Sequence, residues 1–132
     1  MGLVQVTRTL ALLLIVFGLG ALVAPGSVAD FAGLQIEPSS GNGFLEIGAA
    51  FGGVTVALGA IALFATFTTS TSAGALLAAV GAVFAAGAAG RLLVGIITTP
   101  VAPTLMGWLL VLLDASIGVV FLLASTAVEP EI

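Results

Sequence analysis

The sequence predicts an all-α protein, an integral membrane four-helix bundle with a short interfacial helix between spans one and two. Of its 132 residues, 61% are hydrophobic and only 6% are charged, whereas about 25% of the residues of a soluble domain are charged. The apolar residues gather in four long runs separated by short polar or proline-containing segments. So little polar surface cannot cover a water-facing globule, but apolar side chains can face lipid without penalty. Because no repeat or linker divides the chain, we expect residues 1–132 to form a single four-span domain.

The composition also excludes several classes of function. The chain contains no cysteine and no histidine, and its two basic residues are Arg8 and Arg91. The usual ligands of zinc, haem and transition metals are therefore missing, and we expect no metal and no cofactor. Two arginines cannot form a basic patch for nucleic acid. No histidine or lysine is present to activate a hydroxyl or carboxylate nucleophile, so we expect a protein that is not an enzyme.

The first predicted span covers residues 6–24. An apolar run over residues 10–24 follows Arg8, and a span of roughly 20 residues forms if Arg8 reaches toward the lipid headgroups. A cleaved signal peptide is the alternative interpretation of a positive residue followed by an apolar run. We expect this segment to be retained as a span.

A short helix is predicted after the first span. Pro25–Gly26 ends span one, and the spacing from Ser27 to Asp30 resembles a capping box. The predicted helix covers residues 28–34. Its apolar residues recur at helical spacing, so we expect the helix to lie flat at the membrane interface. These residues are Val28, Phe31 and Leu34.

Three further apolar runs predict the remaining spans. They cover residues 44–67, 73–97 and 104–127, and the segments between spans include residues 37–43, 66–72 and 98–103. Small residues share one face of these runs, which lets helices approach closely where lipid removes the hydrophobic drive for association. We expect the following glycines to lie at helix–helix contacts: Gly48, Gly52, Gly53, Gly87, Gly95, Gly107 and Gly118.

Three charged residues lie within these apolar runs. Glu46 is near the start of span two, Arg91 is near the end of span three, and Asp114 is in span four. Alternating span direction puts them on one side of the bilayer, at depths of roughly 3 to 4 Å, about 9 Å and about 15 Å. A planar guanidinium has five donors and can serve two carboxylates. We therefore expect one network of these three charges.

This network has two interpretations. It is either a structural clamp that fixes the helices, or an active site in the form of a proton or ion relay or a polar ligand site. An unpaired charge near the centre of a membrane helix costs about 2.5 to 3.5 kcal/mol, so pairing is required in both cases.

Several motifs spread over nearly the whole chain also suggest a family. They are Pro25 and Gly33 after span one, Asn42, Glu46 and Phe51–Gly52–Gly53 in span two, Gly90–Arg91 in span three and Asp114 in span four. Their order resembles the bacterial family of small four-span membrane proteins called domain of unknown function 4345, related to DoxX-like proteins. The chain has Gly48 where that family tends to have arginine, and Phe51 where it tends to have tyrosine. The resemblance implies a four-helix fold and assigns no activity.

For function, the glycine-lined faces favour an interaction or accessory subunit that packs against a second copy or a larger membrane complex. The alternative is a small proton, ion or solute carrier that uses the charge network. A hydrophobic groove could also hold a lipid or another hydrophobic small molecule. Arg8 precedes span one, whereas the next loop carries only acids, so we expect both termini in the cytoplasm, with the protein in the bacterial inner membrane.

Overall fold

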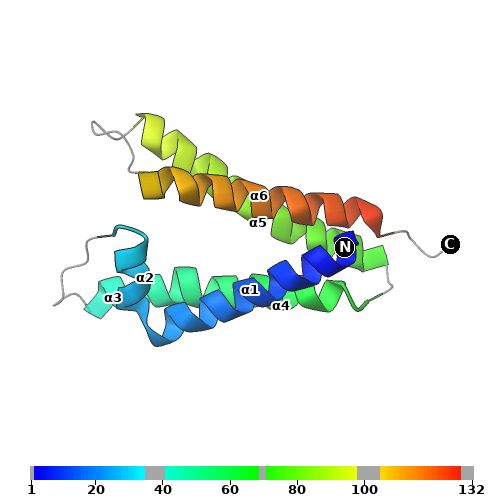
Figure 1. Ribbon diagram of the computed structural model, residues 1–132, viewed down its shortest axis with the longest axis horizontal. Helices are drawn as coiled ribbons and strands as arrows, with labels where there is room; N and C mark the ends of the chain where they lie inside the picture. The colour runs from blue at the N-terminus through cyan, green and yellow to red at the C-terminus, as the bar shows by residue number, and fades with distance from the viewer. Residues whose placement is uncertain (1, 35–40, 69–70, 98–104, 129–132) are drawn as a thin grey trace.

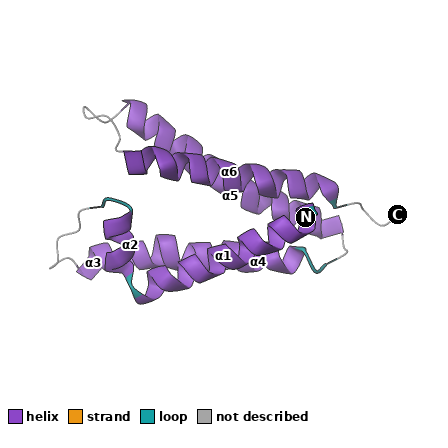
Figure 2. Cartoon of the chain, in the orientation of Figure 1, coloured by secondary structure: helices purple, strands orange, loops and turns teal. Residues whose placement is uncertain are grey.

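The computed structural model describes residues 2–34, 41–68, 71–97 and 105–128. Within these residues the secondary structure is helical, which confirms the predicted all-α fold (Figures 1 and 2). The elements are α1 (Leu3–Val23), α2 (Pro25–Phe31), α3 (Gly41–Ile47), the π-helical segment η1 (Gly48–Gly53), α4 (Val54–Ala65), α5 (Thr71–Ile97) and α6 (Leu105–Ala127).

Four of the described helical stretches are long and apolar enough to cross a membrane. They are Leu3–Val23, Gly41–Ala65, Ser72–Ile97 and Leu105–Ala127. The four predicted spans are therefore present, with bounds that differ by up to three residues at each end. The predicted loop at residues 98–103 and most of the predicted turn at residues 37–43 lie outside the described residues.

The second span is α3, η1 and α4 in direct succession. In η1 the hydrogen bonds of the helix widen to the i→i+5 pattern, which rotates the residues before the segment relative to those after it. A stripe of residues read at α-helical spacing across residues 48–53 is consequently broken. The sequence predicts a regular α-helix here, and the π-helical segment is a difference from that prediction.

The spans are arranged as two pairs of helices. The first pair is α1 with η1 and α4, and the second pair is α5 with α6. The two pairs come together near the N-terminus, at the end where α4 finishes and α5 begins, and they spread apart at the end that holds α2 (Figure 1). Each pair is held by close contact within itself, and the pairs meet mainly at one end.

Glycines bring the backbones of α1 and the second span together. A Cβ atom on Gly18 would lie 2.8 Å from the carbonyl oxygen of Gly52, and one on Gly59 would lie 2.8 Å from that of Ala11. A Cβ atom on Gly52 would lie 2.7 Å from Cγ of Leu22. Since real Cβ atoms do not approach other atoms this closely, only glycine fits without a shift of the neighbouring helix.

The second pair is built in the same way. A Cβ atom on Gly81 would lie 3.0 Å from the carbonyl oxygen of Gly118, and one on Gly118 would lie 3.0 Å from the backbone nitrogen of Ala85. Gly52 and Gly118 thus lie at helix–helix contacts, as the sequence predicts, whereas Gly18, Gly59 and Gly81 are contacts that the sequence analysis missed.

Other predicted packing glycines have different surroundings. A Cβ atom on Gly48 or Gly53 would meet no atom within 4 Å, so the predicted packing role is wrong for both residues. Gly52 belongs to the same segment and does face α1, so Gly48 and Gly53 lie on other sides of η1. Gly87 faces a charged pair, described below, and Gly95 and Gly107 are half-buried near the ends of their helices.

The helix α2 begins earlier than predicted. It starts at Pro25, whose fixed φ and missing N–H suit the first helical position, and no side-chain capping bond is present, so the predicted capping box at Ser27 does not form. The helix ends at Phe31, before the predicted end at Leu34. Gly33 follows at φ 71°, and the Leu34 N–H donates to the carbonyl of Ala29 at 2.8 Å. This is a Schellman ending, for which glycine is the preferred residue.

The orientation of α2 agrees with an interfacial helix. It runs across the direction of the long helices at the spread end of the bundle (Figure 1). Phe31 and Leu34 are exposed, whereas Ala29 is buried against the protein. An apolar face that the protein leaves uncovered at the end of the spans is what an interfacial helix presents to lipid.

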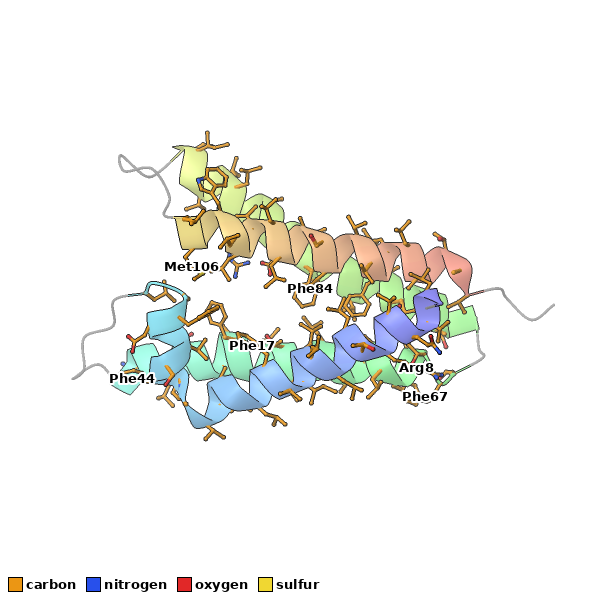
Figure 3. The ribbon with its side chains drawn as sticks, in the orientation of Figure 1. Arg8, Phe17, Phe44, Phe67, Phe84 and Met106 are labelled. Atoms are coloured by element: carbon orange, nitrogen blue, oxygen red, sulfur yellow. The ribbon has the colours of Figure 1, made fainter. Side chains whose placement is uncertain are left out.

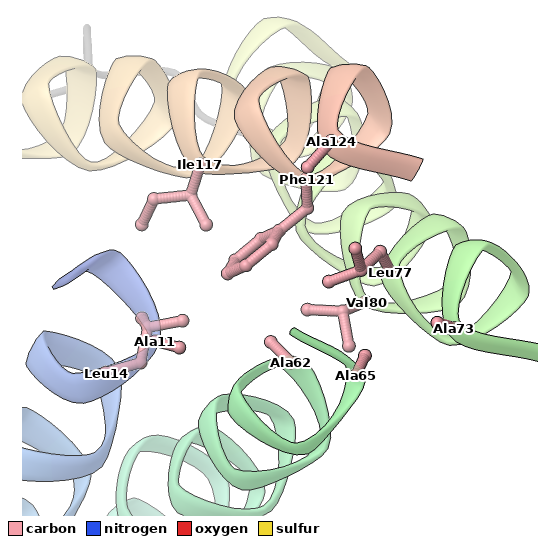
Figure 4. Packing of buried hydrophobic residues seen from close by; sticks show 10 residues of the cluster. All are labelled: Ala11, Leu14, Ala62, Ala65, Ala73, Leu77, Val80, Ile117, Phe121 and Ala124. Atoms are coloured by element: carbon pink, nitrogen blue, oxygen red, sulfur yellow. The ribbon is translucent and has the colours of Figure 1, made fainter. Parts of the chain in front are cut away.

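The hydrophobic core lies at the end where the two pairs meet (Figure 4). Phe121 of α6 is fully buried, and its ring stacks on that of Phe84 of α5 with 6.4 Å between the ring centroids. The buried cluster consists of Ala11, Leu14, Ala62, Ala65, Ala73, Leu77, Val80, Ile117, Phe121 and Ala124. The core therefore closes one end of the bundle and leaves the other end open.

Candidate functional site

A cavity of about 390 Å³ lies between the two helix pairs, on the open side of the core. Its volume falls in the range of about 300 to 1,000 Å³ that is typical of small-molecule sites. All four spans contribute to the wall. The lining residues are Leu10, Leu13, Leu14, Phe17, Ala50, Phe51, Val54, Thr55, Leu58, Val83, Phe84, Gly87, Arg91, Leu110, Leu113, Asp114 and Ile117.

The wall of the cavity is almost entirely apolar. Thr55, Arg91 and Asp114 are the only polar side chains among its lining residues. Figure 3 shows Phe17 and Phe84 directed into the space between the helix pairs, from α1 and α5. Phe84 also stacks on Phe121 of the core, so the cavity borders the core at this side chain. An apolar site with a few convergent polar groups is the usual form of a site for a hydrophobic ligand.

Arg91 of α5 and Asp114 of α6 form an ion pair between Nη1 and Oδ2. Arg91 lies six residues before the end of α5, and Asp114 lies nine residues after the start of α6, so they are about 9 Å and about 14 Å inside their helices. At that depth in a membrane each charge needs a partner, since a lone charge is expensive. The close contact of α5 with α6 brings the two side chains together.

Gly87 lies beside this pair and lines the cavity. Gly87 precedes Arg91 by one helical turn, and a Cβ atom there would lie 3.5 Å from Oδ2 of Asp114. A side chain at this position would therefore contact the pair. The protein leaves 38% of the Arg91 side chain and 16% of the Asp114 side chain uncovered. The pair can consequently be reached by a molecule in the cavity.

Glu46 is not part of this arrangement. Its side chain is exposed, it does not line the cavity, and the ion pair of Arg91 is with Asp114 alone among the described residues. The predicted three-charge network is therefore corrected to a pair. Glu46 lies in α3, before η1, and the second span pairs with α1 rather than with α5. The predicted depths of the three charges in the membrane were compatible with a network. Glu46, however, lies on an exposed face of α3, and its span has α1 as its main neighbour.

The part of the chain that the structure describes contains no cluster of three or more acidic, histidine or cysteine side chains able to hold a metal ion. Comparison of the chain with protein-family models, curated proteins and solved structures found no match. The resemblance to the domain of unknown function 4345 family accordingly stays a prediction.

Two of the three polar cavity residues could be predicted from the sequence, which also allows for a hydrophobic groove but does not place it. Arg91 and Asp114 are conspicuous because they are charges in apolar runs. Thr55 is a neutral residue, and a single threonine in a span gives no signal. The cavity depends on the separation of the two helix pairs at one end, which no local pattern encodes.

Proposed function

We propose that this integral membrane protein binds one amphipathic, lipid-like molecule in the cavity between its helix pairs. The single observation that carries the proposal is an apolar cavity of about 390 Å³ with an accessible Arg91–Asp114 pair in its wall. The apolar wall suits an aliphatic chain, and the pair suits a polar head. The volume lies near the lower limit for ligand sites, which favours a single chain.

The geometry gives less support to the two functions that the sequence favours. The interaction role was inferred from glycine faces, yet Gly18, Gly52, Gly59, Gly81 and Gly118 are used for contacts inside the bundle. The carrier role needs a path past the charges, and beyond the cavity the bundle is filled by the buried core. Both roles remain proposals of lower rank.

A matched pair of substitutions tests ligand binding. Leu113 lines the cavity and its neighbour Leu112 does not, and both side chains are more than half exposed. We expect Leu113→Trp to fill the cavity and Leu112→Trp to leave it open. The proteins would be purified in mild detergent, and retained small molecules would be detected by native mass spectrometry.

The wild-type protein and Leu112→Trp should retain an amphipathic molecule, and Leu113→Trp should lose it. The proposal fails if the wild-type protein retains nothing, or if Leu113→Trp retains as much as Leu112→Trp. Thermal unfolding of each variant in the same detergent would show that both are folded.

A further inference from the structure

We infer that the cavity selects a molecule whose polar head is uncharged and both donates and accepts hydrogen bonds, such as a long-chain alcohol. This inference rests on the proposed ligand site and adds the chemical class of the ligand. It follows from the charge balance of the cavity wall.

The polar groups of the wall carry no net charge. Arg91 contributes one positive charge, Asp114 contributes one negative charge, and Thr55 is neutral. The other lining residues are apolar. Glu46, the acid closest in sequence to the lining residues of the second span, does not line the cavity. A charged head would therefore bring an unbalanced charge into apolar surroundings, which is unfavourable.

A neutral hydroxyl head has partners of both kinds in the wall. The guanidinium has five N–H donors, and among the described residues its ion pair with Asp114 uses Nη1, so further donors on its accessible edge can reach an acceptor in the cavity. Asp114 uses Oδ2 toward Arg91 and has further acceptor capacity on its carboxylate. A hydroxyl group can thus accept from Arg91 and donate to Asp114 without breaking their ion pair.

Three probes with the same aliphatic chain test this inference: dodecanol, dodecylammonium and dodecyl sulfate. All three would be added at one concentration, below the micelle concentrations of the two charged probes, to the purified protein in lipid nanodiscs, and binding would be measured as retained radiolabel. We expect the wild-type protein to retain dodecanol about tenfold more strongly than either charged probe. Leu113→Trp should abolish retention of dodecanol, while Leu112→Trp should not.

Variants of the pair should change the preference in opposite directions. Asp114→Asn leaves Arg91 unbalanced and should favour dodecyl sulfate, whereas Arg91→Gln leaves Asp114 unbalanced and should favour dodecylammonium. The double variant Arg91→Gln with Asp114→Asn is again neutral and should prefer dodecanol, which keeps the test usable if a single variant does not fold.

The outcomes distinguish the two proposals. If the wild-type protein retains a charged probe as well as or better than dodecanol, and Leu113→Trp abolishes that retention, the charge-balance inference is overturned and the ligand site stands. If no probe is retained, or if Leu113→Trp retains dodecanol at the wild-type level, the ligand site itself is overturned.

Discussion

The guanidinium of Arg8 on α1 is joined by two hydrogen bonds to Thr66, the C-cap residue of α4. Nη2 donates to the carbonyl oxygen of Thr66 at 2.9 Å, and Nε donates to its hydroxyl oxygen at 3.2 Å. The guanidinium also lies 4.2 Å from the ring centroid of Phe67 (Figure 3). A cation at the C-terminal end of a helix satisfies a free carbonyl and complements the helix dipole. Arg8 therefore caps the C-terminal end of α4.

Replacing Arg8 by leucine should destabilise the contact between α1 and α4. We expect a loss of about 1 to 2 kcal/mol in the free energy of unfolding, because hydrogen bonds from a charged donor are lost. Titration with sodium dodecyl sulfate in mixed micelles would measure it. Thr66→Val should cost less, since it removes the hydroxyl and keeps the carbonyl. Equal stability of Arg8→Leu and the wild-type protein would show that the cap contributes nothing.

Removing one member of the Arg91–Asp114 pair should be worse than removing both. Arg91→Leu strands Asp114 inside the membrane, at a cost of roughly 2.5 to 3.5 kcal/mol. The double variant Arg91→Leu with Asp114→Leu should be closer to the wild-type protein, because no charge is left alone. The same detergent titration applies, with Glu46→Gln as a control outside the pair. A double variant less stable than Arg91→Leu would contradict this account.

Two glycines on α1 offer a matched test of helix packing. A Cβ atom on Gly18 would lie 2.7 Å from Cγ2 of Val56, whereas one on Gly20 would meet no atom within 4 Å. We expect Gly18→Ala to lower the free energy of unfolding by about 1 to 3 kcal/mol through overpacking. Gly20→Ala should be neutral or stabilising by up to about 1 kcal/mol, because alanine favours helix. Similar melting temperatures for the two variants would refute the contact.

The predicted orientation can be tested with single cysteines, because the chain has none of its own. Thr68 follows α4 at the end of the bundle near Arg8, and Ser27 lies in α2 at the opposite end (Figure 1). If both termini are cytoplasmic, a membrane-impermeant thiol reagent added to intact cells should label Ser27→Cys and leave Thr68→Cys unlabelled. The reverse pattern would place the N-terminus outside.

The sequence by itself determined that the chain is suited to a membrane, that its fold is all-α, and where its spans lie. Hydropathy over roughly 20 residues is a local property, and a bilayer accepts a helix of that length wherever it occurs. The depths of Arg91 and Asp114 follow from counting residues along a helix, so their proximity could be predicted as well. Gly33 is also a local signal, because it fits the left-handed helix ending, but the predicted helix over residues 28–34 runs through it.

Only the tertiary structure decided which helices are partners and where they separate. The exclusion of Glu46 from the charged pair goes with the pairing of its span with α1 and with its exposed position on α3. Gly18 packs and Gly20 does not, although both are glycines in one apolar run. In these apolar helices nearly every face is hydrophobic, so the pattern that marks a buried face in a soluble helix is absent. The contact faces, and with them the cavity, are set by the fit of whole helices against each other.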